Sequence, residues 1–374
     1  MGRKQEQIRG CLLGSAAGDA LGYCVDSLRL DEIHTRYGPD GIRGYDTLNG
    51  IAPISSHTQL GMFTANGLLF GATRGALRGN MAPYVNYLLV FYRDWVRTQR
   101  VRTDIHTKPY AWLCQVEELY ARRCSDPGVT FALMHNPPGT MDEPVNRSQG
   151  SAGLTRCIPI GLFLSPKEMR REEICLLGAE SAALTQGDPL GFLPAAVLTG
   201  LLNRIVYDRA DSFRNHLLMT LSAAQRQFGK KYPSFVQLRD RIAQAADLAN
   251  DPRTSQEVME LLRPRDAAGI LASACYICLR HPGDYDRGIV AAVNHSGESA
   301  AVGAVVGALL GAQVGMDGIP EFYLEPLELR DIMEELAVDL FQGCPFTQGS
   351  ELYDDVWYQK YVQGTYEKGA YEEL

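Results

Sequence analysis

Apolar side chains recur at three- and four-residue intervals along most of the chain, whereas the alternating pattern typical of strands is rare. Apolar residues at this spacing share one face of a helix. A helix is also expected after Ser55 and Ser56, whose hydroxyls suit an N-cap. We therefore predict an all-α fold. The pattern itself predicts helices over Gln5–Leu21, Pro83–Arg97, Pro109–Cys124, Lys167–Leu184, Leu193–Val206, Ser212–Phe228, Ser234–Asn250, Arg265–His281 and Leu327–Phe341.

Glycine recurs every fourth position in two of the helical segments, a spacing that places the glycines on one helix face and lets two backbones approach closely. The second segment, Ser299–Met316, carries no charge and nearly reaches membrane-spanning length. Because it consists mostly of Gly and Ala, it is only weakly hydrophobic. We interpret it as the central helix of a soluble protein, with no membrane span. The glycines are Gly14, Gly18, Gly22, Gly303, Gly307 and Gly311.

Composition and charge narrow the possible partners. The chain has 374 residues, 45% of them hydrophobic and 21% charged, with a net charge of −8. A mildly acidic protein is a poor ligand for nucleic acid or for a membrane surface. No linker separates one part of the chain from another, so we expect a single domain over residues 1–374. The absence of a recognisable leader favours a cytoplasmic protein.

The nine cysteines are odd in number and scattered, which suits reduced thiols better than a disulfide framework. Cys275 and Cys278 form a lone C-x-x-C pair. A zinc site would require a second pair at matching spacing, and none exists in the sequence. We expect these two thiols to lie in the core.

In two segments near the N-terminus, polar residues interrupt an otherwise apolar sequence. Within Gly14–Asp26, the carboxylates of Asp19 and Asp26 interrupt a packing surface, and the simplest interpretation is one solvated and one capping Asp. The second segment is SSHT, from Ser55. A helix N-terminus disfavours a protonated imidazole, so we expect His57 to be neutral and able to act as a hydrogen-bond acceptor or a base.

Two further segments carry polar clusters next to helices. The loop that begins at Asn146 runs into a helical segment carrying Arg156, and such a loop presents backbone N–H groups that suit a phosphate or a ribose. Near the second glycine stripe, Asn294, Ser296 and Glu298 crowd the entrance of a very apolar helix. Capping alone needs fewer polar groups, so we interpret this cluster as part of a site.

Taken in order, these segments resemble the motifs of the ADP-ribosylglycohydrolase family. GSAAGDALG resembles its G-x-x-x-G-D-A-x-G, and RSQGSAGLTRCIPIG resembles its S-K-G-x-G-G-x-M-R-x-x-P-x-G. GAESAALTQGDPLGFLPAA resembles its helix and T-H-x-x-P turn, and NHSGESAAVGAVVGALLGA its N-x-x-G-D-x-D-(S/T) helix. The resemblance spans nearly the whole chain. It implies an all-helical hydrolase that cleaves the bond between ADP-ribose and a modified side chain at a two-magnesium centre.

The magnesium ligands that the resemblance implies are replaced in this chain. The family's Thr-Asp-Asp matches Ser55, Ser56 and His57, and its Asp-x-Asp-(S/T) begins at Glu298 and ends in Ala300 and Ala301. Magnesium prefers hard oxygen ligands, usually including carboxylates, and a neutral imidazole suits other metals better. We therefore predict that the chain holds no metal and needs no cofactor.

The resemblance also carries over positions for binding and catalysis. Asp26 matches an acidic residue that assists catalysis in some members, and with His57 and Glu298 it forms the candidate catalytic set. The turn His of the family is replaced by Gln186. The candidate ligand-binding residues are Asn146, Ser148, Gly150, Arg156, Gln186, Asn294, Ser296 and Gly297.

Three interpretations remain open at this stage. The first is a pseudoenzyme-like, metal-independent relative that binds ADP-ribose, a related nucleotide or a protein partner without the family's hydrolysis. The second is a repurposed enzyme in which Asp26, His57 and Glu298 act as acid and base on a glycosidic or other small substrate, which requires no metal. The third is a structural or toxin-blocking protein that kept only the fold.

Overall fold

The computed structural model describes residues 2–99, 107–123, 126–346 and 354–366 and is all-helical over these ranges. Only two isolated β-bridges occur within them, and the all-α prediction is confirmed. The first helices are α1 (Arg3–Tyr23), α2 (Leu30–Tyr37), α3 (Ser56–Arg78), α4 (Tyr84–Thr98), α5 (Pro127–Met134), α6 (Ala152–Arg156), α7 (Ile158–Phe163) and α8 (Arg171–Ala183). They are followed by α9 (Pro189–Tyr207), α10 (Phe213–Phe228), α11 (Phe235–Leu248), α12 (Ser255–Leu262), α13 (Ala267–Arg280), α14 (Tyr285–Val293), α15 (Ser299–Val314), α16 (Glu321–Leu324), α17 (Arg330–Gln342) and α18 (Asp355–Tyr358).

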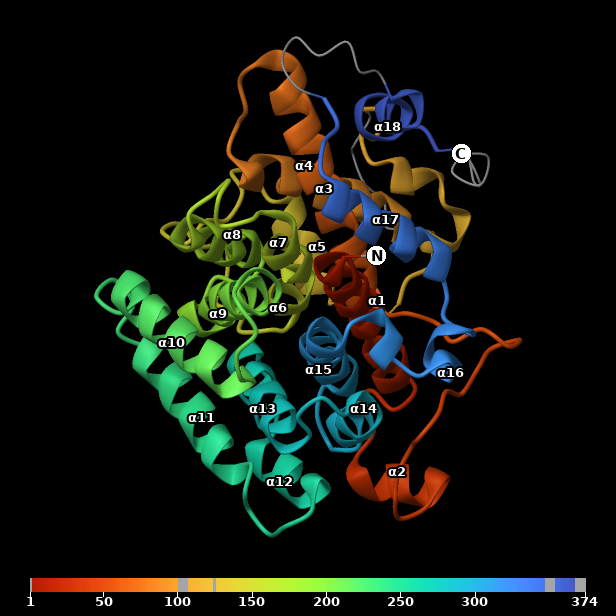
Figure 1. Ribbon diagram of the computed structural model, residues 1–374, viewed down its shortest axis with the longest axis vertical. Coiled ribbons are helices and arrows are strands. Elements are labelled where there is room, and N and C mark those ends of the chain that lie inside the picture. The colour runs from red at the N-terminus through yellow and green to blue at the C-terminus, as the bar shows by residue number, and fades with distance from the viewer. Residues whose placement is uncertain (1, 100–106, 124–125, 347–353, 367–374) are drawn as a thin grey trace.

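The two glycine stripes face each other at the centre of the fold. Figure 1 shows α1 and α15 side by side in the middle of the molecule. Gly14 lies against the carbonyl of Gly307, and a Cβ built on it would be 2.6 Å from that oxygen. Gly10 and Gly18 oppose Gly311 and Gly303 in the same way, so the helices are antiparallel. This packing brings the end of α1 to the beginning of α15.

The core helices are buried as the glycine and apolar patterns indicate. Fourteen successive residues of α15, from Ser299 to Ala312, are buried, which confirms its central position. α9 is long and apolar enough to span a membrane by length and composition, but 89% of its apolar window is buried inside the protein. Cys275 and Cys278 are free thiols in the core, as expected.

The predicted helix over Pro109–Cys124 is wrong. This stretch forms only two short 3₁₀ helices, η1 (Trp112–Gln115) and η2 (Glu117–Leu119), and its last residue lies outside the described part of the chain. The Asp94 carboxylate on α4 accepts from the backbone N–H groups of Tyr110 and Ala111, at 2.8 and 3.0 Å. These tertiary hydrogen bonds hold the start of the stretch away from helical geometry.

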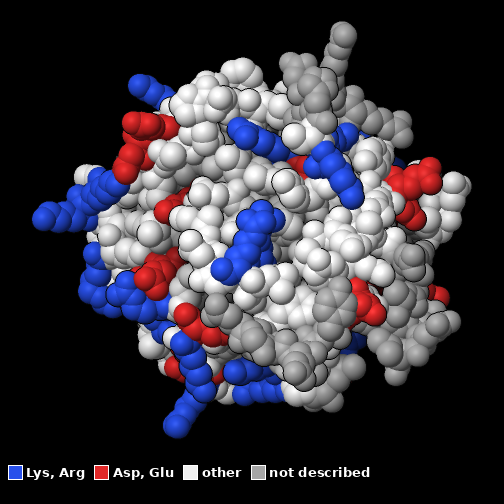
Figure 2. Space-filling model, turned by 90° about the horizontal axis from the view of Figure 1, so that it is seen from above, with Lys and Arg blue, Asp and Glu red and all other residues white. Residues whose placement is uncertain are grey.

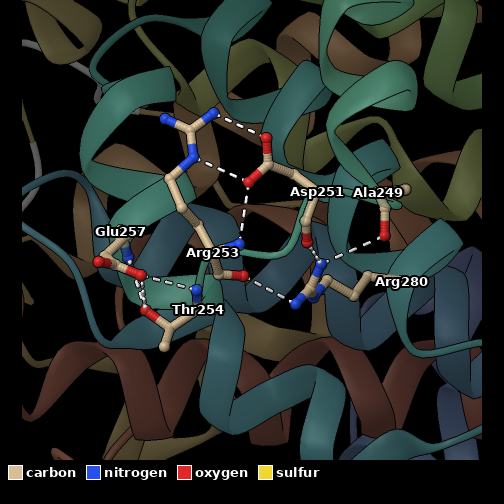
Figure 3. A network of polar contacts seen from close by, with 6 residues as sticks. All are labelled: Ala249, Asp251, Arg253, Thr254, Glu257 and Arg280. Carbon is tan, nitrogen blue, oxygen red and sulfur yellow. Dashed lines mark hydrogen bonds and ion pairs between the residues drawn. The ribbon is translucent and has the colours of Figure 1, made fainter.

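Hydrogen bonds from side chains fix the connection between α11 and α12 (Figure 3). The Asp251 carboxylate accepts from the backbone N–H and the guanidinium of Arg253, at 2.8–2.9 Å. Arg280, at the end of α13, donates to the carbonyls of Asp251 and Arg253 at 2.6 and 2.8 Å. Thr254 and Glu257 then form a capping box that begins α12, a helix that its apolar pattern did not predict.

Basic and acidic residues are both present on the surface, as the charged composition of the sequence indicates. On the face seen from above, Lys and Arg side chains are scattered and interspersed with Asp and Glu among many uncharged residues (Figure 2). Several charges are locally paired, including Arg36 with Asp46 and Arg330 with Glu321, each at 2.6 Å. Exposed pairs of this kind contribute little to stability, so the fold depends on its packing.

The central helix pair is tested by adding one methyl group. Gly18→Ala is expected to lower the free energy of unfolding by about 2 kcal/mol or more, because the new Cβ meets the α15 backbone, which cannot move aside. Gly61→Ala on α3 is the matched control, since a Cβ there meets nothing within 4 Å, and it is expected to stabilise by about 0.5–1 kcal/mol. Urea denaturation measures both, and similar effects of the two substitutions would contradict the packing described.

Candidate functional site around the start of α3 and α15

Asp19 of α1 is fully buried and holds the beginning of α3. Its carboxylate accepts from the backbone N–H of Ser55 at 2.9 Å and of Thr58 at 3.3 Å. The hydroxyls of the same two residues donate to it at 2.5 Å. The expectation of one solvated and one capping Asp is therefore wrong, because Asp19 is buried at the start of α3 and Asp26 also accepts from a helix N-terminus. A buried carboxylate with four donors at a helix N-terminus is stabilised by both the hydrogen bonds and the helix dipole.

His57 lies half-buried in the first turn of α3, beside a small cavity. Its Nδ1 is 2.9 Å from the Thr155 hydroxyl of α6. The cavity has a volume of about 30 Å³, room for about one water molecule, and it is closed on one side by Met333 and Leu336 of α17. The Nδ1 atom of the imidazole is thus held by a side chain from another helix.

Glu298 and Asp26 meet at the beginning of α15. Asp26 follows α1 and accepts from the backbone N–H of Ala300 at 3.1 Å, so it caps α15 from another helix. Glu298 accepts a short hydrogen bond from the Ser151 hydroxyl. Burial raises the pKa of both carboxyl groups; the nearby Asp19 carboxylate further raises the pKa of Asp26, and the Asp26 carboxylate further raises the pKa of Glu298. A proton on the His57 imidazole would lower both pKa values, so the three candidate catalytic residues share one electrostatic environment.

The predicted binding loop is held in shape by its own side chains. The Asn146 carboxamide accepts from the backbone N–H groups of Ser148 and Gly187 at 2.9 and 3.0 Å, and donates to the Thr185 carbonyl at 2.9 Å. The Ser148 hydroxyl accepts from Gly150 N–H at 3.1 Å. Asn146 and Ser148 therefore use their side chains to shape the loop.

Gln186 lies beneath this loop and is 1% exposed. Its Oε1 accepts from the Thr185 hydroxyl at 2.5 Å, and a Cβ built on Gly150 would lie 3.9 Å from its Nε2. The structure therefore brings Asn146, Ser148, Gly150 and Gln186 together, as the motif order implies.

Arg156 is engaged with the end of α8. It is fully buried, stacks 4.5 Å from the Tyr92 ring, and donates to the carbonyls of Ser181 and Ala182 at the end of α8. Burial lowers its pKa, and its Nε and Nη1 atoms have no hydrogen-bond partner. A cation at the carboxyl end of a helix stabilises the helix dipole. These contacts favour a structural role over the ligand-binding role expected from the motif.

Asn294, Ser296 and Gly297 fix the chain between α14 and α15. The Asn294 carboxamide pairs with both backbone groups of Ile42, at 2.8 and 2.9 Å. The Ser296 hydroxyl accepts from Leu30 N–H at 2.8 Å, which ties the start of α2 to this connection. A Cβ on Gly297 would lie 2.7 Å from the Pro264 carbonyl. Asn294 and Ser296 thus use their polar atoms to anchor neighbouring loops, and Gly297 allows close packing against the Pro264 carbonyl.

Comparison with known proteins agrees with this arrangement. The model of the ADP-ribosylglycohydrolase family matches residues 2–349. The chain belongs to the ADP-ribosylglycohydrolase family. A solved structure titled "ADP-ribosylglycohydrolase-related protein complex" is similar over 91% of this chain and 99% of that one, with a TM-score of 0.57 and 22% identity. At this identity the likeness concerns the fold. The comparison with curated proteins found no match.

The donor atoms around α3 and α15 do not fit the two-magnesium centre of ADP-ribosylglycohydrolases. Ala300 and Ala301 have no side-chain donors, and Asp19 already accepts four hydrogen bonds. Within the described ranges, no three His, Cys, Asp or Glu side chains are grouped so as to hold a metal ion. Two divalent cations bound here would have one imidazole, that of His57, and the carboxyl groups of Asp26 and Glu298 as neighbouring ligands. The Asp26 carboxylate already caps α15.

Two hydroxyl residues of the site were missed by sequence reasoning. Ser151 donates to Glu298, and Thr155 contacts His57, so both belong to the candidate site. They stand four residues apart and lie at the two ends of the first turn of α6. This spacing was visible in the sequence and pointed to one helix face, but nothing in the sequence showed which side chains that face meets.

The role of Asp19 is tested by deleting its carboxylate. Asp19→Ala is expected to lower the free energy of unfolding by about 2–4 kcal/mol, because it leaves buried donors at the start of α3 unsatisfied. Asp247→Ala, at an exposed position of α11, is the control and is expected to change stability by less than about 0.5 kcal/mol. Chemical denaturation of both variants measures the difference. A small effect of Asp19→Ala would mean that α3 begins without this support.

Proposed function

We propose that this chain is a metal-independent member of its family, which binds ADP-ribose or a closely related nucleotide without the magnesium-dependent hydrolysis. One observation carries the proposal. Asp19 of α1 and Asp26, which follows α1, accept hydrogen bonds from backbone N–H groups at the starts of α3 and α15, and the positions that match metal ligands hold Ser, His, Glu and Ala. Protein groups therefore satisfy N–H groups at the starts of both helices.

The preformed loop supports binding of a nucleotide. Side chains of Asn146 and Ser148 turn the loop back on itself and join it to the Thr185–Gly187 turn, so no ligand is needed to fold it. A loop ordered in advance binds with a smaller entropic cost. Backbone N–H groups in such a loop suit phosphate oxygens.

A second candidate function rests on the carboxyl pair. Asp26 and Glu298 are partly buried near one another, and both have a raised pKa. A carboxyl group with a raised pKa can donate a proton to a leaving group, and a second carboxylate or an imidazole can act as base. Metal-free cleavage of a glycosidic bond by Asp26, His57 and Glu298 would use these groups directly.

Thermal-shift titration with ADP-ribose tests the first proposal. In EDTA, ADP-ribose is expected to raise the melting temperature, because a ligand that binds only the native state stabilises it by mass action. Excess magnesium should not enlarge the shift. Asn146→Ala should reduce the shift strongly by releasing the loop, whereas Asn250→Ala, at an exposed position outside the candidate site, should leave it unchanged.

The contrary outcomes separate the candidates. A shift that appears only with magnesium would overturn metal independence. Release of ADP-ribose from an ADP-ribosylated protein in EDTA would favour the second candidate instead. The rate of this release should then fall as pH rises through the raised pKa of Glu298, because the Glu298 carboxyl loses the proton that it donates. Glu298→Gln should lower the rate at least about a hundredfold.

A further inference from the structure

A second cavity lies away from the candidate site, between α4, α8, α10 and the loop 138–142. It has a volume of about 520 Å³, within the range of small-molecule sites. None of its lining residues belongs to the site around Glu298 and His57. Leu89 of α4, Leu176 of α8 and Phe228 of α10 contribute to its apolar wall. We call it the Glu180 cavity after the one acidic residue of α8 that lines it.

Glu180 is the unexplained group of this cavity. It is half-buried on α8, and no hydrogen bond or ion pair reaches its carboxylate from the part of the chain that the structure describes. Desolvation raises its pKa, with no compensating charge nearby. Because a partly buried charge without a partner is unfavourable, a cation that entered the cavity would gain an ion pair that the folded protein does not make by itself.

The other polar groups of the cavity are consistent with a cationic ligand. Lys231 and Asp142 form an ion pair at 2.5 Å, and both are more than half exposed, so they neutralise each other at the mouth. Tyr232 is 8% exposed, and its ring packs edge-on against Phe192 and lies 5.4 Å from the Lys231 ammonium. The charge left over in the cavity is that of Glu180, beside an apolar wall.

We propose that the Glu180 cavity binds a small organic amine whose protonated nitrogen pairs with the Glu180 carboxylate and whose apolar body lies against Leu89, Leu176 and Phe228. A neutral or anionic ligand of the same shape would leave the carboxylate unpartnered and would bind more weakly. The ligand class is therefore set by charge as well as by shape, and none of the cavity's lining residues is among the candidate nucleotide-binding residues.

Calorimetric titration of the full chain with tryptamine tests this proposal at pH 7. Tryptophol, which replaces the amine by a hydroxyl, is the neutral counterpart. We expect tryptamine to bind at least about tenfold more tightly than tryptophol, as hydrogen bonds to charged groups are the stronger ones. Glu180→Gln should abolish this preference. Glu172→Gln, at an exposed position on the same helix α8, should keep it.

The pH dependence gives an independent readout. Tryptamine affinity should fall as pH is lowered through the raised pKa of Glu180, because the protonated carboxyl no longer pairs with the amine. Tryptophol binding should not change over this range. The proposal is overturned if tryptamine does not bind, if it binds no better than tryptophol, or if Glu180→Gln retains the preference while its melting temperature shows that it is folded.

Discussion

The close antiparallel contact between α1 and α15 is the constraint on which the rest of the structure depends. Only glycine at Gly10, Gly14 and Gly18 lets the α1 backbone approach α15 without a clash. This contact sets the end of α1 beside the beginning of α15, where Asp26 reaches the backbone N–H of Ala300. From within α1, Asp19 reaches the beginning of α3. One helix therefore positions both halves of the candidate site.

Helix capping by carboxylates explains how the site persists with the metal-ligand positions replaced. The N-termini of α3 and α15 each carry unsatisfied N–H groups and a partial positive charge. Asp19 and Asp26 of the α1 region satisfy part of this demand at both termini. An anion at these termini is favourable by itself, so the two helices are capped although Ser55, Ser56, Ala300 and Ala301 offer no carboxylate there.

Much of the fold was predictable because it follows from local patterns. Helical periodicity located α8, α10, α11 and α13 to within a few residues, and the glycine spacing identified α15 as the central helix. The helix predicted over Pro109–Cys124 was wrong because the backbone N–H groups at its start donate to the Asp94 carboxylate of α4, a tertiary contact that no local pattern shows. α12 and α14 were missed, although Thr254 and Asp284 cap them; their apolar faces are short. Arg156 shows the limit of motif matching, since its position follows the family but its guanidinium is buried against α8.

Metal independence is the central claim, and calorimetric titration with magnesium tests it most directly. The chain is first freed of metal with EDTA and exchanged into metal-free buffer. The account predicts no saturable binding up to millimolar magnesium, because Ala300 and Ala301 offer no ligand atoms and Asp19 is fully hydrogen-bonded. Micromolar binding of two magnesium ions per chain would contradict the account and restore the family's metal centre.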